Sequence, residues 1–329
     1  MQNRLKSYLS INKVKTFINN ISSQNKTHAY LFSGYDNTSL KYIVNLVAMS
    51  FSFNNSEKPC LYCSNCKKIL GKKSIDVFSY PSSNNTNILV KDIEQINDIS
   101  STRPLDLDYK IFILNNIENS SIAAQNKLLK ILEEPPKYVI FILSSSNLES
   151  VLPTVKSRCR ILDIPRLDER EIEAYLKDES NINKDKIEIA SSNSFGHIGK
   201  ALEILDNDRY FKIYDFIFDM ILNMHTSKDM LKFSFQIKQD KKNLKTYLEI
   251  LENLFRDLLN VKQNLSNLVS NKNKKKNLYD ISDLYTNKSI IEILKRINTF
   301  NIMLNQNSNQ LYIVDNLLIS ILEERYKWN

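Results

Sequence analysis

Three of the four cysteines in this sequence lie within seven residues of one another. They form the pattern Cys60-x2-Cys63-x2-Cys66, whereas the fourth, Cys159, lies far along the chain. Thiolates at this spacing wrap readily around one tetrahedral Zn²⁺ ion. A closed structural site takes four ligands, and the fourth could be water, another side chain, or Cys159 if the fold brings it near. The pattern predicts a structural zinc site with an unidentified fourth ligand; three surface thiols without a metal are the alternative.

The segment after the apolar run at 29–32 stands where a phosphate-binding loop would lie. A working loop has the pattern G-x-x-x-x-G-K-[ST], because glycines let backbone N–H groups wrap the phosphates and the lysine neutralises their charge. Here only the first glycine is present, and the segment is degenerate at Gly34, Asn37, Ser39, Leu40 and Lys41. Asp36 adds negative charge where a triphosphate would sit, and Lys41 falls within the helix that is predicted to follow. We expect no ATP binding; by itself, the segment could also be an ordinary strand-to-helix turn.

A second apolar run, at 111–114, ends in Asn115 and Asn116. An active ATPase of this kind ends that strand in acidic residues, because one carboxylate holds Mg²⁺ and a second orients the attacking water. An asparagine side chain is neutral and cannot act as a base. The pair therefore predicts an acidic site that has lost its chemistry.

Arg158 lies in the tripeptide Ser-Arg-Cys, just before a predicted strand at 161–164. An arginine held at such a point can stabilise charge on a phosphoryl group bound by a neighbouring subunit. A lone arginine is more often a solvated or ion-paired surface residue, so the tripeptide alone does not decide between the two interpretations.

The elements that must position these residues follow from the hydrophobic pattern. Four apolar runs of strand length alternate with helical segments: 29–32, 111–114, 139–143 and 161–164. Apolar strands separated by helices are typical of a parallel sheet covered on both faces. Helices are predicted at 39–53 and at 120–134, the second ending at Pro135 because proline cannot donate the helical hydrogen bond. Asp92 is predicted to be the N-cap of a further helix, and after Pro165 only helical periodicity remains.

Charge and hydropathy exclude some classes of protein. No apolar stretch reaches the roughly 18 residues that a membrane span requires, and the start of the chain lacks the apolar core of a signal peptide. We therefore expect a cytoplasmic protein without a membrane partner, whose thiols are reduced and available to a metal. The net charge of +8 favours acidic partners such as nucleic acid. The dense basic run at 272–276 is predicted to be an exposed loop, and it lacks aromatic side chains for base stacking.

Four stretches, in this order and at these approximate separations, resemble the clamp-loader family of AAA+ proteins. They are His-Ala-Tyr-Leu-Phe-Ser-Gly at 28–34, the cysteine pattern at 60–66, Leu-Leu-Lys-Ile-Leu-Glu-Glu-Pro-Pro at 128–136, and Leu-Pro-Thr-Val-Lys-Ser-Arg-Cys at 152–159. The combination of Leu-Glu-Glu-Pro-Pro with Ser-Arg-Cys is specific, although each is weak alone. The resemblance covers about residues 1–205, and Gly-His-Ile-Gly-Lys-Ala-Leu at 196–202 matches the lid segment of the family.

The resemblance implies three domains. We expect an α/β AAA+ core over 1–165, with a parallel sheet, helices on both faces and a Cys-rich zinc-type insertion near 60–66. A helical lid is expected over 166–208 and an all-α collar for oligomerisation over 209–329. The family usually carries an earlier fourth zinc cysteine, at the end of the helix after the phosphate loop. Residues 48–52 hold no cysteine, which leaves full coordination of the metal open.

Within the family, the chain resembles the delta-prime subunits of bacterial DNA polymerase III, which often lack a working phosphate loop, and departs from gamma/tau subunits, which keep one. The resemblance implies a non-hydrolysing subunit without intrinsic enzymatic activity; any polymerase activity would belong to the holoenzyme. Its partners would be gamma/tau and delta subunits in a hetero-oligomeric ring that loads the sliding clamp onto primed DNA during DNA replication. Arg158 would be an arginine finger for a neighbouring ATPase subunit. The alternatives are an active gamma/tau-type ATPase with an atypical phosphate loop and a zinc-containing DNA-binding protein.

Overall fold

The chain forms two compact units. The computed structural model describes residues 2–23, 27–34, 36–52, 59–81, 87–179, 183–305 and 310–327. One unit comprises Met1–Asn181 with Phe195–Lys200, and the other comprises Ile182–Ser194 with Ala201–Asn329. The finer division into a lid over 166–208 and a collar over 209–329 stays a prediction.

A five-stranded parallel sheet lies at the centre of the first unit. Its strands are β1 (Ala29–Ser33), β2 (Val77–Tyr80), β3 (Lys110–Leu114), β4 (Val139–Ser145) and β5 (Arg160–Asp163). They lie in the order β2-β3-β4-β1-β5, and every pair of neighbours is parallel. Tyr30 pairs with Ile142 and Phe112 pairs with Phe141. The parallel sheet predicted from the apolar runs is confirmed.

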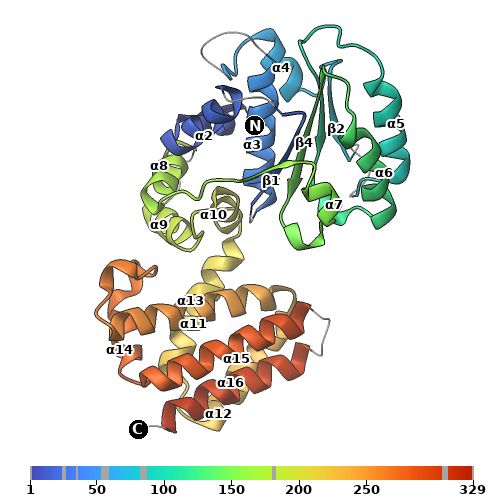
Figure 1. Ribbon diagram of the computed structural model, residues 1–329. Coiled ribbons are helices and arrows are strands. Elements are labelled where there is room, and N and C mark those ends of the chain that lie inside the picture. The colour runs from blue at the N-terminus through green and yellow to red at the C-terminus, as the bar shows by residue number, and fades with distance from the viewer. Residues whose placement is uncertain are drawn as a thin grey trace. The chain divides into compact units, whose positions relative to one another are not determined.

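Helices cover both faces of this sheet, as Figure 1 shows. Those of the first unit are α1 (Gln2–Ser10), α2 (Asn12–Ser23), α3 (Asn37–Phe51), α4 (Ser64–Leu70), α5 (Val90–Ser100), α6 (Ile122–Glu133), α7 (Pro153–Lys156) and α8 (Glu169–Glu179), with 3-10 helices η1 (Ile117–Asn119) and η2 (Leu148–Ser150). α3 packs against β1, β3 and β4, and α2 packs against α3. α5 and α6 cover the other face, where the rings of Phe112 and Phe141 stack with centroids 5.4 Å apart. This cover on both sides explains why the strands are apolar throughout.

The start of α5 differs from the prediction. The N-cap residue is Leu89, and Asp92 is the third helical residue. The Asp92 carboxylate reaches back and accepts a hydrogen bond from the Leu89 N–H at 2.7 Å. The prediction of Asp92 as the N-cap was wrong, because an acidic residue in the first turn can satisfy an unpaired N–H group from inside the helix.

The second unit is entirely helical among the residues that the structure describes. Its elements are α9 (Lys184–Ser192), α11 (Asp208–Asn223), α12 (Ser227–Gln239), α13 (Leu244–Lys262), α14 (Lys275–Ser282), α15 (Asn287–Asn305) and α16 (Gln310–Tyr326), with η3 (Lys241–Asn243), η4 (Ser266–Leu268), η5 (Lys272–Lys274) and most of α10 (Ile198–Leu205). α13 packs against α11, α14 and α15, and α16 packs against α12 and α15. These contacts confirm the predicted all-α C-terminal part. None of the described helices is both long and apolar enough to cross a lipid bilayer.

The basic run at 272–276 is not a loop. It forms η5 and the start of α14, and the residue before it, Asn271, is buried. Asp257 of α13 accepts hydrogen bonds from the N–H groups of Ser270 and Asn271, at 2.9 and 2.8 Å. Lys272, Lys275 and Lys276 are exposed as predicted, but the prediction of a loop was wrong. A carboxylate from a distant helix satisfies the backbone here, and sequence composition alone does not contain that contact.

Candidate phosphate-loop and arginine sites

In the turn from β1 into α3, an aspartate side chain of the turn itself caps the start of the helix. Asp36 is the N-cap residue of α3, and its Oδ1 accepts a hydrogen bond from the Ser39 N–H at 2.6 Å. Free N–H groups at the start of a helix are the groups that bind phosphate in a working loop. The Asp36 side chain, which is 14% exposed, therefore already lies where a bound anion would lie.

The positions that a working loop gives to glycine and lysine hold packing residues instead. Counted along the pattern, the second glycine falls on Ser39, the lysine on Leu40 and the hydroxyl residue on Lys41. Ser39 and Leu40 are buried in α3. A Cβ atom added to Gly34 would lie 2.4 Å from the side chain of Ile164, so an isoleucine covers the backbone at the first glycine. The turn packs into the protein where a working loop would face a ligand.

Residues from distant parts of the same unit enclose Asp36. Nδ1 of His197 lies 3.8 Å from Asp36 Oδ2, and the His197 side chain is 8% exposed. A Cβ atom added to Gly199 would lie 1.8 Å from Asp36 Oδ1, so the close approach requires glycine. Burial lowers the pKa of His197, although the charge of Asp36 opposes this shift, and the imidazole is neutral at pH 7. Burial also raises the pKa of Tyr8 on α1, and the charge of Asp36 adds to the rise.

The end of β3 carries two amide side chains where an active site would carry carboxylates. The N–H and the side-chain amide of Asn115 both donate to the carbonyl oxygen of Tyr80, at 2.9 and 3.0 Å. Asn116 has a left-handed backbone conformation, with φ of 53°, and its N–H donates to Ser144 Oγ. The next acidic residue, Glu118, accepts hydrogen bonds from the chain just after β4. Neither asparagine can act as a general base, and a neutral amide is a poorer Mg²⁺ ligand than a carboxylate.

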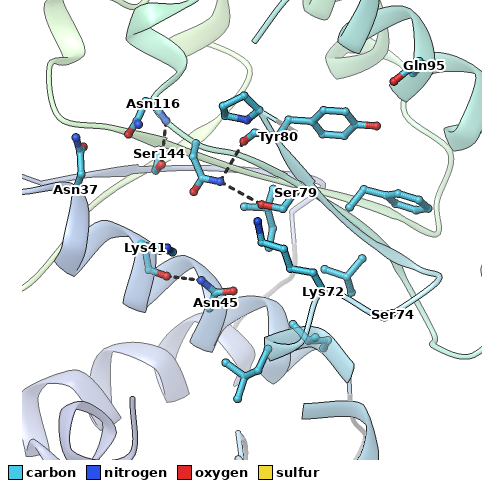
Figure 2. Close-up of a pocket in the computed structure, with 17 residues that line it drawn as sticks. Asn37, Lys41, Asn45, Lys72, Ser74, Ser79, Tyr80, Gln95, Asn116 and Ser144 are labelled. Carbon is cyan, nitrogen blue, oxygen red and sulfur yellow. Dashed lines mark hydrogen bonds between the residues drawn. The ribbon is translucent and has the colours of Figure 1, made fainter. Parts of the chain in front are cut away.

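A cavity of about 700 Å³ opens beside these amides, next to the carboxyl ends of β2, β3 and β4 (Figure 2). Asn37 and Lys41 of α3 line it together with Asn115 and Asn116. Lys72, from the turn after α4, also lines the cavity, and Figure 2 shows its side chain extending toward Ser79. Ligands of open α/β sheets bind at this edge of the sheet. The lining residues include two lysines and no aspartate or glutamate.

Arg158 lies in the turn between α7 and β5. Its Nη1 donates to the carbonyl oxygen of Thr154 at 2.9 Å, and its Nη2 forms an ion pair with Glu133 at the end of α6. Glu133 belongs to the Leu-Glu-Glu-Pro-Pro stretch, so the two most specific stretches of the sequence are in contact. Because α6 ends before β4 starts and Arg158 precedes β5, the ion pair lies at the amino ends of the strands. The ion pair therefore lies at the opposite end of the strands from Asp36, which follows the carboxyl end of β1.

The three clustered cysteines gather around the start of α4. Their Sγ atoms all lie within 4.8 Å of one another, and those of Cys60 and Cys66 are 3.9 Å apart. Ligands at about 2.3 Å from a tetrahedral zinc ion are separated by about 3.8 Å. Cys63 is the N-cap residue of α4, and the left-handed backbone of Leu61, with φ of 65°, turns the chain between the first two thiols. The cluster therefore has the dimensions that a metal ion requires.

Cys159 does not join this cluster. Its side chain packs against the hydrophobic core of the first unit, and burial raises its pKa to about 12. Burial also raises the pKa of Cys66 to about 12, whereas hydrogen bonds from neighbouring residues lower the pKa of Cys60 although burial opposes them. Among the described residues, the possible metal ligands in the cluster are these three thiols alone. Cys159 is thereby excluded as the fourth ligand considered from the sequence.

The predicted residues therefore occupy separate places. Gly34, Ser39 and Leu40 pack within the turn after β1; Asn37, Lys41, Asn115 and Asn116 share the cavity; Arg158 and the cysteines lie elsewhere. Sequence reasoning missed three further residues. His197 and Glu133 stand inside stretches that resemble the family, but their contacts with Asp36 and Arg158 exist only in the folded chain. Lys72 carries no recognisable signal in the sequence.

Comparison with known proteins gives a consistent result. The family described as "DNA polymerase III, delta subunit" matches residues 10–168. The delta-prime subunit of DNA polymerase III from Bacillus subtilis is 26% identical over 75% of this chain and 76% of its own length. The tau subunit from the same organism is 30% identical over 58% of this chain, but over only 35% of its own length. A gamma subunit-related protein of known structure from Thermotoga maritima aligns over 95% of this chain and 100% of its own, with 17% identity and a TM-score of 0.45.

The matches to tau and gamma relatives extend over only part of those proteins. They span 35% of the Bacillus subtilis tau subunit and 55% of a gamma subunit from Buchnera aphidicola. The match to the delta-prime subunit is longer, at 254 residues, and extends beyond the first unit of this chain. The chain is therefore similar, over residues 10–168 and beyond, to clamp-loader subunits of DNA polymerase III, and its parallel sheet and helical C-terminal part accompany this similarity.

Proposed function

We propose that this chain is a delta-prime-type clamp-loader subunit that does not bind or hydrolyse ATP. The observation that carries the proposal is the hydrogen bond from the Ser39 N–H to the Asp36 carboxylate. A triphosphate entering the turn would have to displace this carboxylate and would meet its negative charge. It would also meet Leu40 where the pattern has a lysine, and Asn115 and Asn116 where it has acids.

The same proposal assigns Arg158 to ATP bound by a neighbouring subunit. Arg158 lies at the amino ends of the strands, whereas this chain's own degenerate site lies at their carboxyl ends, so the arginine cannot serve that site. Its ion pair with Glu133 is partly exposed, with the Arg158 side chain 31% and the Glu133 side chain 50% accessible. Exposed ion pairs are worth about 0–1 kcal/mol, so a γ-phosphate could replace Glu133 as the partner of Arg158 at little cost.

The partners follow from the proposed place of the chain in the ring. They would be gamma/tau and delta subunits, with the sliding clamp and primed DNA reached through the assembled complex in the cytoplasm. The cysteine cluster would hold a structural zinc ion through Cys60, Cys63 and Cys66. Zinc would supply a cross-link between the start of α4 and the chain before it, and it would take no part in ATP hydrolysis or clamp loading.

Nucleotide binding separates this proposal from an active gamma/tau-type ATPase. We expect the isolated full-length chain to show no binding of Mg-ATP by calorimetry at millimolar concentration. Asp36→Asn keeps an N-cap acceptor but removes the charge, and we expect it to remain without binding because the lysine and the acidic residues are still absent. Tight binding of Mg-ATP by the unaltered chain would overturn the proposal in favour of the active ATPase.

The role of Arg158 is tested in the reconstituted complex with its clamp and primed DNA. Arg158→Ala should leave assembly intact and slow hydrolysis at the site that it faces by about a thousandfold, measured in a single turnover. Glu133→Gln, which releases the arginine, should not slow hydrolysis, and the exposed Arg160→Ala is the matched control. An unchanged rate in Arg158→Ala would contradict the proposal. Equal losses in Arg158→Ala and Glu133→Gln would mean that the ion pair only supports the fold.

A further inference from the structure

The cavity at the carboxyl ends of β2, β3 and β4 has an unbalanced charge. Lys41 and Lys72 line it, and among the described lining residues the other polar side chains belong to asparagine, glutamine, serine and tyrosine, with no acidic residue. Neither ammonium group forms an ion pair with any residue that the structure describes. Two positive charges therefore line one open cavity, and no described carboxylate pairs with either of them.

The two lysines come from different elements, so the arrangement depends on the fold. Lys41 lies on α3, two residues after Ser39, whose N–H donates to Asp36. Lys72 has a left-handed backbone, with φ of 53°, in the turn that ends α4, and its side chain extends into the cavity (Figure 2). The lining also includes apolar side chains, among them Phe78 and Ile113. The volume, about 700 Å³, lies within the usual range of about 300–1,000 Å³ for small-molecule sites.

We propose that this cavity binds a small organic phosphate without a divalent metal ion. Lysine ammonium groups bind phosphate as point charges, and Lys41 and Lys72 would hold the phosphate while the apolar side chains of the lining cover the organic part. Mg²⁺ is disfavoured, because the cavity offers no carboxylate ligand and two positive charges repel a cation. The site differs from a triphosphate loop because the N–H groups at the start of α3 are already occupied by Asp36. The inference goes beyond the proposed function and does not depend on it.

The test uses phenyl phosphate and inorganic phosphate as probes, with the full-length chain in EDTA. We expect calorimetry to show binding of phenyl phosphate, weaker binding of inorganic phosphate, and affinities that fall as ionic strength rises. Lys41→Ala and Lys72→Ala should each weaken binding about tenfold, since each removes one charge-assisted hydrogen bond. Both lysines are exposed, so the variants should fold. Lys73→Ala, which removes an exposed lysine outside the cavity, is the matched control and should bind within about twofold of the unaltered chain.

The outcomes separate this inference from the proposed function. No binding of phenyl phosphate at about 10 mM would overturn the inference and leave the proposed function intact. An equal loss in Lys73→Ala would overturn it as well, because the attraction would then be a general property of the basic surface. Binding that requires Mg²⁺ would overturn the metal-free site, and if the ligand were Mg-ATP it would also contradict the proposed function.

Discussion

Two aspartates of the first unit, the buried Asp76 and the partly buried Asp36, accept hydrogen bonds from backbone N–H groups, but they do so differently. Asp76 precedes β2 and accepts from three consecutive N–H groups, those of Leu105, Asp106 and Leu107, at 2.6 to 3.0 Å. Asp36 accepts from a single N–H group, and its Oδ2 is buried without a hydrogen bond from any described residue. The first carboxylate is saturated with donors, and the second is not.

The difference indicates two uses of one interaction. Backbone N–H groups that converge on a point attract an anion, whether it belongs to a ligand or to the chain. Around Asp76 they fix a loop that has no helix or strand of its own, and the carboxylate is 1% exposed. At Asp36 the same attraction operates in the crevice where relatives with a working loop would hold phosphate. An unsatisfied buried oxygen at that point is consistent with a carboxylate that replaces a larger anion.

The largest effect is expected from Asp76→Ala. The substitution leaves three backbone donors without an acceptor, and each buried unsatisfied donor costs about 1–3 kcal/mol, so the free energy of unfolding should fall by about 3 kcal/mol or more. Hydrogen exchange at the 105–107 amides should accelerate with it. Asp106→Ala is the control, because it removes only an exposed ion pair with Lys68 and should cost less than about 1 kcal/mol. Equal losses of unfolding free energy in the two variants would mean that the hydrogen bonds to Asp76 do not stabilise the fold.

An intermediate effect is expected from Gly199→Ala, which forces a methyl group onto the Asp36 carboxylate and the Thr38 side chain. Overpacking of this kind costs about 1–3 kcal/mol, measured by denaturant unfolding. Asp36→Gly alone should cost only a few tenths of a kcal/mol, because glycine is tolerated as an N-cap. In the double variant, Asp36→Gly should recover at least half of the loss. Strict additivity of the two substitutions would mean that the close contact does not limit stability.

The smallest effect concerns pH and His197. Burial lowers the folded-state pKa of His197 below the ordinary value near 6.5, so the neutral imidazole is favoured in the fold. Its contribution to stability is fully present above pH 6.5 and is lost as the pH falls through the lowered pKa. We expect a lower Tm at pH 5.5 than at pH 7.5, and the difference between these two Tm values should be smaller in His197→Gln. In Asp36→Asn, NMR titration should show a still lower pKa for His197, because the carboxylate charge that raises this pKa is gone. A higher pKa for His197 would mean that Asp36 does not act on the imidazole.

The fold was largely predictable, because long apolar runs and proline specify local structure. The run at 139–143 appears within β4, and the helix predicted to stop at Pro135 ends at Glu133. The turn of Asp36 was partly predictable, since an acidic residue within the segment of a phosphate loop already indicates repulsion of a triphosphate. Its hydrogen bond to Ser39 and its enclosure by His197 were not, because they depend on the local backbone and on a segment about 160 residues away.

The failures of prediction share a physical cause. The basic run at 272–276 looked like a solvated loop, but Asp257 of α13 pins the preceding backbone and the run becomes helical. The pairing of Arg158 with Glu133 is likewise a contact between the ends of two separate elements. In each case a side chain satisfies a partner that lies far away in sequence, and neither periodicity nor propensity contains that information.

The carboxylate that closes α3 also affects how the subunit responds to the cell around it. A protein that binds a nucleotide gains stability in proportion to the logarithm of ligand concentration, so its folded population follows the supply of that nucleotide. An anion that is part of the chain cannot dissociate or be depleted. Under the proposed function, Asp36 takes the place of a bound phosphate, and the melting temperature of the first unit should not change with the concentration of Mg-ATP.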